Sequence, residues 1–229
     1  MNTITIGIPC YNQAEYLPQA IESAMSQTIP CEVIVVNDGS KDNTLEVARK
    51  YSVKVINQVN KGLSAARNSA IMASTGSWFL PLDADDFLET NAVERLLRLA
   101  ESTGADVVAP SLREFGISSA VVILMQEPKL KDFLIGNRIP YCSLIRKSAL
   151  LECGGYSPRM EPGYEDYALW FDLLTRGKRF ISSNEVLFNY RTKPVSMITE
   201  AKKHHTELMN KIYKDFPQIL PGEIRTVSV

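Results

Sequence analysis

Histidine is nearly missing from this sequence. The chain has 229 residues and only two histidines, His204 and His205, which stand side by side near the carboxyl end. Imidazole is the usual general base near neutral pH and the commonest metal-binding side chain. A site built from several histidines is therefore not expected, and histidine-dependent catalysis is confined to one place. Catalysis elsewhere in the chain would have to rely on carboxylates.

Cysteine is also scarce, and its spacing has no pattern. The four cysteines are Cys10, Cys31, Cys142 and Cys153, and no two of them form a CxxC pair. Disulfide frameworks and thiolate zinc sites need regular, close spacings. Neither kind of site is expected here.

The sequence also lacks long apolar runs and a leader segment, and its net charge is close to zero. The apolar run AVVILM is far too short to span a bilayer, and MNTITIGIPCYN at the start lacks the basic and apolar regions of a signal peptide. The formal net charge is −1, so no overall field attracts nucleic acid or an acidic membrane. We expect a cytoplasmic protein with no nucleic-acid partner and, at most, peripheral contact with the inner face of the membrane.

Strands and helices alternate through the first hundred residues. Apolar residues alternate in TITIGIP, as in a half-buried strand, and CEVIVVN is nearly all apolar, as in a parallel strand buried on both faces. Helical spacing of apolar residues follows each strand. We predict strands at 3–9, 31–37, 53–57 and 77–82. We predict helices near 17–25, after the turn at DGSKDNT as far as about residue 50, at 61–75 and at 90–103. This order predicts an α/β fold with a mostly parallel sheet, whose ligands lie at the carboxyl ends of the strands.

The pattern changes after Pro110. The sequence predicts strands at 120–125, 141–148 and 184–191, a short helix within 127–137, and a loop leading into a helix within 154–177. Residues 196–216 are predicted to form one amphipathic helix with Ala201, His205, Leu208 and Ile212 aligned. No repeat or linker divides the chain. We interpret residues 1–229 as one domain with a nucleotide half (about 1–110), an acceptor half (about 111–195) and a helical tail (about 196–229).

Three aspartates stand together after the strand at 77–82. Asp83, Asp85 and Asp86 would repel one another unless they fan into solvent or hold a cation. Asp is favoured at turns and helix N-termini, so capping is the simple alternative. Mg²⁺ and Mn²⁺ prefer oxygen ligands, and Mg²⁺ is usually held by one or two carboxylates plus substrate phosphates. Because this cluster shares its sheet edge with other polar loops, we favour the metal site.

Two of those loops carry candidate nucleotide contacts. Asp38 follows a strand and could accept a hydrogen bond from the imide of uracil or thymine, or serve as a turn residue before a glycine. Lys61 and Arg67 flank the start of a helix at Gly62, where close backbone approach and the helix dipole favour an anion. Arg67 could pair with a phosphate or with an aspartate. Tyr11 could stack on a base or pack beneath its loop.

Late in the chain, Glu165 and Asp166 open a predicted helix. Carboxylates in the first turn of a helix are favoured by the dipole alone. With no histidine near in sequence, this pair also offers the best general base for deprotonating a hydroxyl. Arg191 could join the phosphate end of the site, and a surface ion pair is the alternative.

Taken together, these segments resemble the family 2 glycosyltransferases of the GT-A fold. The segments that match, in the order of the family, are IPCYNQAEYLPQAIES, VIVVNDGSKDNT, NKGLSAARNSA, FLPLDADD and GGYSPRMEPGYEDYALW. The resemblance implies a nucleotide-binding half with a mostly parallel sheet merged with a smaller, mixed acceptor half. It also implies inverting transfer from a nucleoside-diphosphate sugar, with UDP or dTDP as the nucleotide, to a carbohydrate or lipid-linked acceptor in polysaccharide or glycolipid assembly.

The resemblance assigns roles residue by residue. For the nucleotide, it implies that Pro9, Tyr11 and Asn12 form the first binding loop. It implies that Asp38 reads the base, and that Lys61, Gly62 and Arg67 form a segment that clamps the nucleotide. For Mn²⁺ or Mg²⁺, it implies that Asp85 is the principal ligand, that Asp83 contacts the ribose or the metal, and that Asp86 shares the ligand role. For catalysis, it implies that Asp166 is the base, with Glu165 beside it.

The chain departs from the family at one position. Many members carry a histidine two residues after the arginine of the late YR segment, where this chain has Lys193. A protonated lysine cannot bind a metal, although it can contact a phosphate. Closure of the metal site by an imidazole is therefore in doubt. The chain also ends soon after its last predicted helix, so we expect no further acceptor or membrane module.

Two other functions compete with this interpretation. A sugar-nucleotide nucleotidyltransferase would normally carry a Gly-rich basic loop after the first strand, whereas PCYNQ contains no lysine or arginine. A catalytically inactive nucleotide-binding module is the second alternative. A phosphoacceptor domain would need an acidic pair after that strand, and none is present. The tail residues Lys202 and Lys203 are interpreted as a solvated helix face, with a lipid headgroup or a second subunit, and hence a homodimer, as alternatives.

Overall fold

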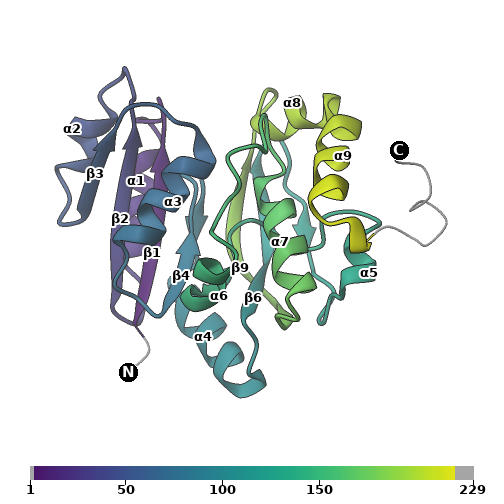
Figure 1. The fold of residues 1–229 in the computed structure, drawn as a ribbon. Coiled ribbons are helices and arrows are strands. Elements are labelled where there is room, and N and C mark those ends of the chain that lie inside the picture. Colours follow the sequence, from purple (N-terminus) through teal and green to yellow (C-terminus); the bar gives the residue numbers. More distant parts are fainter. Residues whose placement is uncertain (1–2, 220–229) are drawn as a thin grey trace.

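The amino-terminal part of the chain forms the parallel half of one large sheet. A computed structural model describes residues 3–219. Each of the first three strands is followed by a helix, which returns the chain to the start of the next strand and makes neighbours parallel. The strands of this half are β1 (Ile4–Cys10), β2 (Cys31–Asp38), β3 (Lys54–Gln58) and β4 (Trp78–Pro81). Their carboxyl ends lie together at the upper edge in Figure 1.

The second half extends the same sheet with mixed pairing. The full order is β3-β2-β1-β4-β8-β6-β9-β5, with β7 paired to β6. β8 runs antiparallel to both β4 and β6, while β6 and β9 are parallel to each other. The strands added here are β5 (Phe87–Leu88), β6 (Val107–Gly116), β7 (Val121–Val122), β8 (Leu144–Arg146) and β9 (Phe180–Thr192). The α/β fold with a mostly parallel sheet is confirmed, and β6 runs across the boundary placed near residue 110.

Helices cover both faces of the sheet and bury its side chains in two cores. In β2, Val33 and Val35 belong to one core, while Ile34 and Val36 belong to the other, as the alternation of side chains along a strand requires. Figure 1 shows α3, α6 and α7 on the near face. The helices are α1 (Leu17–Met25), α2 (Thr44–Ala48), α3 (Leu63–Ala73), α4 (Ala92–Thr103), α5 (Leu130–Phe133), α6 (Lys147–Glu152), α7 (Glu165–Thr175), α8 (Met197–Lys203) and α9 (His205–Asp215), followed by the 3₁₀ turn η1 (Pro217–Ile219).

Some of the predicted elements differ from those in the structure. Of the strand predicted at 120–125, only the two residues of β7 form a strand. β7 pairs only with β6, and Val121 and Val122 are exposed, so little burial supports a longer strand there. The strands β5 and β6 had not been expected. The single tail helix is two helices that break at His204, and His205 is exposed rather than aligned with the buried Leu208. Residues 220–229 of the tail lie outside the described part of the chain.

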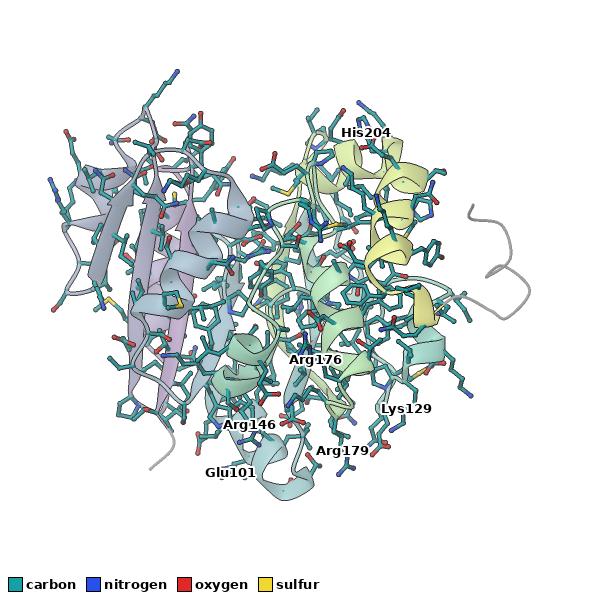
Figure 2. All side chains as sticks on the ribbon, in the orientation of Figure 1. Glu101, Lys129, Arg146, Arg176, Arg179 and His204 are labelled. Atoms are coloured by element: carbon teal, nitrogen blue, oxygen red, sulfur yellow. The ribbon has the colours of Figure 1, made fainter. Side chains whose placement is uncertain are left out.

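Several arginines lie away from the carboxyl ends of the parallel strands. Figure 2 shows Arg146, Arg176 and Arg179 in the lower part, whereas His204 lies at the top. These arginines form ion pairs with partly exposed carboxylates, such as Arg146 with Asp106 at 3.0 Å. Exposed pairs of this kind contribute at most about 1 kcal/mol. Within residues 3–219, no helix combines the length and apolar character needed to cross a bilayer.

Candidate active site

A cleft of about 530 Å³ opens at the carboxyl ends of the parallel strands. Loops that follow β1, β2 and β4 form one side of it, and the segment before α7 and the end of β9 form the other. It therefore lies where ligands bind in open α/β sheets. The expected site residues that line it are Pro9, Tyr11, Asp38, Gly62, Asp83, Asp85, Asp86, Glu165 and Arg191. Asn12, Lys61 and Arg67 were also expected there and do not line this cleft.

Asp38 is the last residue of β2 and is almost fully buried. Its carboxylate accepts hydrogen bonds from the backbone N–H groups of Lys61 (3.0 Å) and Gly62 (2.9 Å) and from the Gln58 amide (2.7 Å). Gly62 has a φ of +85°, and a Cβ there would approach Glu161 Oε1 to 2.6 Å. Asp38 thus holds the start of α3 against the cleft, while the Lys61 side chain points into solvent.

The loop after β1 is tied to the loop after β2. The backbone N–H of Asn12 donates to Ser40 Oγ at 3.0 Å, and Asn12 Oδ1 accepts from the Lys41 N–H at 2.7 Å. These two hydrogen bonds fix the backbone beside Tyr11, whose side chain is 45% exposed at the mouth of the cleft. An exposed ring on a fixed loop offers a flat face on which a base can stack.

Arg67 forms the buried centre of the site. Its guanidinium donates to Asp83 Oδ1 at 2.8 Å and to Glu165 Oε1 at 2.5 Å, and it lies over the ring of Tyr141 at 4.8 Å. Burial opposes its charge, but the two carboxylates raise the pKa of Arg67 well above its usual value. The sequence left open whether Arg67 pairs with a phosphate or with an aspartate, and in the structure it pairs with Asp83.

The three crowded aspartates have three different surroundings. Burial, with the charges of Asp85 and Glu165, raises the pKa of Asp83 to about 6, although Arg67 opposes this. Asp86 is 1% exposed, and it accepts hydrogen bonds from the Tyr141 hydroxyl (2.6 Å) and the Arg191 N–H (2.6 Å). Burial raises the pKa of Asp86 well above its usual value.

Asp85 forms an ion pair across the cleft. Its Oδ2 lies 2.5 Å from Lys193 Nζ, at the position where the family often has a histidine. Its backbone carbonyl accepts from Arg191 Nε at 2.8 Å. The Lys193 ammonium lies 4.6 Å from the centre of the Tyr16 ring, and the Arg191 guanidinium lies 4.6 Å from the same centre. The end of β9 is thereby joined to the loop after β4.

These aspartates do not form a ready cation site. Asp83 is bound to Arg67, Asp86 is buried against Tyr141 and Arg191, and Asp85 is paired with Lys193. A divalent ion on Asp85 would meet the ammonium already held there. Within residues 3–219, no group of three histidine, cysteine, aspartate or glutamate side chains is arranged to hold a metal. As arranged here, the residues expected to bind Mn²⁺ or Mg²⁺ do not fit a resident ion.

A second cavity of about 470 Å³ adjoins the cleft and contains Asp166. Residues that line both cavities include Asp83, Glu165 and Tyr190. Asp166 Oδ2 accepts a hydrogen bond from Asn137 Nδ2 at 2.9 Å, and Oδ1 accepts from the Tyr167 N–H at 2.7 Å. Burial, reinforced by the Glu165 charge and opposed by Arg67, raises the pKa of Asp166 to about 7. A carboxylate with such a pKa is well suited to accept a proton near neutral pH.

Sequence reasoning missed several residues that organise this site. The Tyr141 hydroxyl joins two of the aspartates, because it donates to Asp86 and accepts from the Asp83 N–H at 2.9 Å. Asn137 orients Asp166, and Lys193 neutralises Asp85. Tyr141 and Asn137 lie within residues 111–195, the part expected to form the acceptor half, where no motif had been recognised. The only local signal among them was the lysine that replaces a histidine.

The architecture is the GT-A fold of glycosyltransferases. The structure superposes on the crystal structure of S. aureus TarS in complex with UDP-GlcNAc with a TM-score of 0.80 at 19% identity, covering 92% of this chain and 65% of that one. It also superposes on the mannosyltransferase PcManGT from Pyrobaculum calidifontis in complex with GDP-Man and Mn²⁺, with a TM-score of 0.68 at 16% identity, covering 96% and 72%. The fold expected from the sequence is confirmed.

The chain belongs to glycosyl transferase family 2, whose model matches residues 5–154. It is 28% identical over 198 residues to WfaP of Escherichia coli, a UDP-Glc:alpha-D-GlcNAc-diphosphoundecaprenol beta-1,3-glucosyltransferase, covering 83% of this chain and 78% of that protein. It is 41% identical over 101 residues to the chondroitin synthase of Pasteurella multocida, covering 42% of this chain. The chain matches only 10% of the length of that synthase.

Proposed function

We propose that this protein is an inverting glycosyltransferase that moves a sugar from a UDP-sugar, or a dTDP-sugar, to an acceptor hydroxyl in polysaccharide or glycolipid assembly. The observation that carries the proposal is the relation of the two cavities. One lies at the carboxyl ends of the parallel strands with Asp38 and Asp85, and the other holds Asp166, with Asp83 and Glu165 in their common wall. A donor in the first and an acceptor in the second would meet at that wall.

The reaction we propose is a single displacement. The acceptor hydroxyl gives its proton to the carboxylate of Asp166 while its oxygen forms a bond to the anomeric carbon. The bond from that carbon to the diphosphate oxygen breaks, and its electron pair leaves with the nucleoside diphosphate. Attack from the face opposite the leaving group inverts the configuration without a covalent intermediate, by the logic that separates inverting from retaining glycosidases. The raised pKa of Asp166, about 7, supports its role as the base.

The choice of donor rests on Asp38 and on similar proteins. Asp38 lies at the cleft with an acceptor-only side chain, which suits the imide N–H of uracil or thymine. TarS was crystallised with UDP-GlcNAc, WfaP is named for UDP-glucose and a diphosphoundecaprenol-linked acceptor, and PcManGT was crystallised with GDP-Man. Two of these three names support a uridine nucleotide, and one of them supports a lipid-linked acceptor.

The metal requirement stays a prediction. The solved structure of PcManGT named above is a complex with GDP-Man and Mn²⁺. The resemblance would place Mn²⁺ or Mg²⁺ on Asp85 with Asp83 and Asp86 beside it, but the ion pairs and hydrogen bonds of these carboxylates do not fit such an ion. Such an ion would supply Lewis-acid stabilisation of the leaving diphosphate. Because those carboxylates are already paired, the mechanism proposed above includes no step through a metal.

Substituting Asp166 by Asn tests the proposed reaction. This change removes the proton acceptor and keeps the shape, so sugar transfer should fall by a factor of about 10² or more while UDP affinity stays within about threefold. Asp172→Asn is the matched control, because Asp172 lies on the same helix and bonds to Arg176 instead of facing either cavity. Transfer that survives in Asp166→Asn would show that Asp166 is not the base.

The products separate the proposal from its rivals. A panel of sugar nucleotides, incubated with the protein with and without Mn²⁺, should yield nucleoside diphosphate and free or transferred sugar. Release of pyrophosphate from a nucleoside triphosphate would instead indicate a nucleotidyltransferase. Nucleotide binding without turnover of any donor would indicate an inactive binding module.

A further inference from the structure

The cleft proposed to hold the nucleotide has an unfavourable charge for a diphosphate. Six carboxylate side chains line it, and among the described residues the lining cations are only Arg191 and Lys193. A diphosphate carries at least two negative charges, and ionised carboxylates lining the same cleft repel it. Asp83 and Glu165 are compensated by Arg67, and burial raises the pKa of Asp86 well above its usual value, so the repulsion comes mainly from the other three. Some cation must therefore face the phosphates if the proposed function holds. The six carboxylates are Asp38, Asp83, Asp85, Asp86, Glu161 and Glu165.

Arg191 is held in place by other partners. Its guanidinium donates to the Asp85 carbonyl at 2.8 Å and to Gln19 Oε1 at 2.9 Å. It also lies over the rings of Tyr16 and Phe115, at 4.6 Å and 4.4 Å from their centres. These contacts hold the guanidinium in place and use two of its five N–H donors. Arg191 therefore positions its loop and adds a second positive charge at this edge of the cleft.

Lys193 has donors to spare. An ammonium group carries three N–H donors, and the ion pair with Asp85 Oδ2 at 2.5 Å uses one direction. The Tyr16 ring, 4.6 Å away, supports the ammonium from one side through a cation–π contact. Lys193 lines the cleft and keeps 25% of its side-chain surface exposed. It is thus a cation that is positioned and still able to donate to a ligand.

We propose that Lys193 is the resident cation of the nucleotide cleft and binds the diphosphate of the donor, so that nucleotide binding needs no divalent metal. The Lys193–Asp85 pair would hold the ammonium where the phosphates arrive, and Asp85 would orient the lysine instead of binding an ion. This inference rests on the proposed function, because it presumes a nucleoside diphosphate in this cleft. It makes Lys193 a specificity-determining residue for the diphosphate.

Comparing UDP with uridine isolates the phosphate contact. In buffer with EDTA, calorimetry and ligand-observed NMR should show that the wild-type protein binds UDP at least about tenfold more tightly than uridine. Adding Mn²⁺ should change UDP affinity by no more than about threefold. Wild-type binding of UDP that is lost in EDTA and restored by Mn²⁺ would overturn the inference.

Three variants make the test specific to the charge. Lys193→Met should reduce the UDP-to-uridine affinity ratio to within about threefold of unity in EDTA, whereas Lys193→Arg should keep it. Lys203→Met is the matched control, because it removes the same charge from an exposed lysine paired with Glu200 outside the cleft. An unchanged ratio in Lys193→Met, or an equal loss in Lys193→Arg, would refute a role for the charge.

Failure of the inference can be distinguished from failure of the proposed function. If uridine binds and UDP binds no better, the nucleotide cleft stands and Lys193 is not its phosphate ligand. If neither ligand binds, with or without Mn²⁺, the cleft is not a uridine nucleotide site and both proposals fall. Thermal unfolding of each variant shows whether it is folded, and the wild-type comparison with and without Mn²⁺ tests the inference without any variant.

Discussion

The side-chain amide of Asn137 donates a hydrogen bond to Oδ2 of Asp166 at 2.9 Å. The other carboxylate oxygen accepts from the backbone N–H of Tyr167 at 2.7 Å. Both bonds favour the ionised form and oppose the effect of burial on the pKa of Asp166. Asn137 therefore both orients the proposed base and limits the rise of its pKa.

Asn137→Ala should impair transfer through Asp166. Without the amide, the carboxylate loses one bond to its charged form, so the pKa of Asp166 should rise and kcat should fall by about tenfold at pH 7. The pH–rate profile should move to higher pH, which a merely structural role would not cause. Asn210→Ala, on the exposed surface of α9, is the control. A profile that stays in place would contradict the positioning role.

The rate of transfer should depend on pH through Asp166. A general base must be deprotonated, so kcat/KM should be low in acid, reach half of its maximum near pH 7, and level off above it, following the raised pKa of about 7. Measurements from pH 5 to pH 9 with a fixed donor test this. A profile with its midpoint near pH 4 would contradict the perturbed environment of Asp166.

The same pKa predicts an effect on stability. The pKa of Asp166 rises from 3.8 to about 7 on folding, so the folded state binds the proton more tightly than the unfolded chain does. The stabilisation from this proton is complete below about pH 4 and is lost as the pH rises through 7. Asp166→Asn should therefore raise Tm relative to the wild type at pH 8, because the Asn137 amide can rotate to donate to or accept from it. The difference should shrink towards pH 4, as measured by thermal unfolding.

Arg67 should be needed for folding stability. Arg67→Met would leave the buried carboxylate of Glu165 and that of Asp83 without their cation. Removing one partner of a buried ion pair typically costs about 3–5 kcal/mol, which urea unfolding would measure. Arg98→Met is the comparison, since Arg98 pairs with Glu94 on the surface of α4 and should cost less than about 1 kcal/mol. Equal losses for the two variants would contradict the central role of Arg67.

Asp38 should set the nucleotide preference. If its carboxylate accepts from the imide N–H of the base, calorimetry should detect UDP or dTDP binding at least about tenfold tighter than CDP binding, because N3 of cytosine carries no hydrogen. Asp38→Ala should also loosen the Lys61–Gly62 turn, which donates two backbone hydrogen bonds to it, and so weaken all nucleotides. Equally tight binding of CDP by the wild type would contradict the base-reading role.

Much of the fold could be predicted from local patterns. Alternating and continuous apolar runs located β1, β2, β3 and β4, because side-chain periodicity reports burial directly. Strand β6 was not predicted because its second half is only partly buried, and β5 was not predicted because it has only two residues. The break between α8 and α9 escaped detection because Ala201 and Leu208, which are seven residues apart and buried in one core, keep helical spacing across it.

The sequence by itself determined the class of the protein and the loops that carry its polar residues, since strand ends and motif order are local properties of the chain. Only the tertiary structure decided which charges meet. Arg67 and Glu165 are 98 residues apart in sequence, and Asn137 and Asp166 are 29 apart. The order of strands in the sheet brings such pairs together, and their burial sets their pKa values. For the same reason, only the folded chain pairs Lys193 with Asp85, where the sequence alone had suggested a metal.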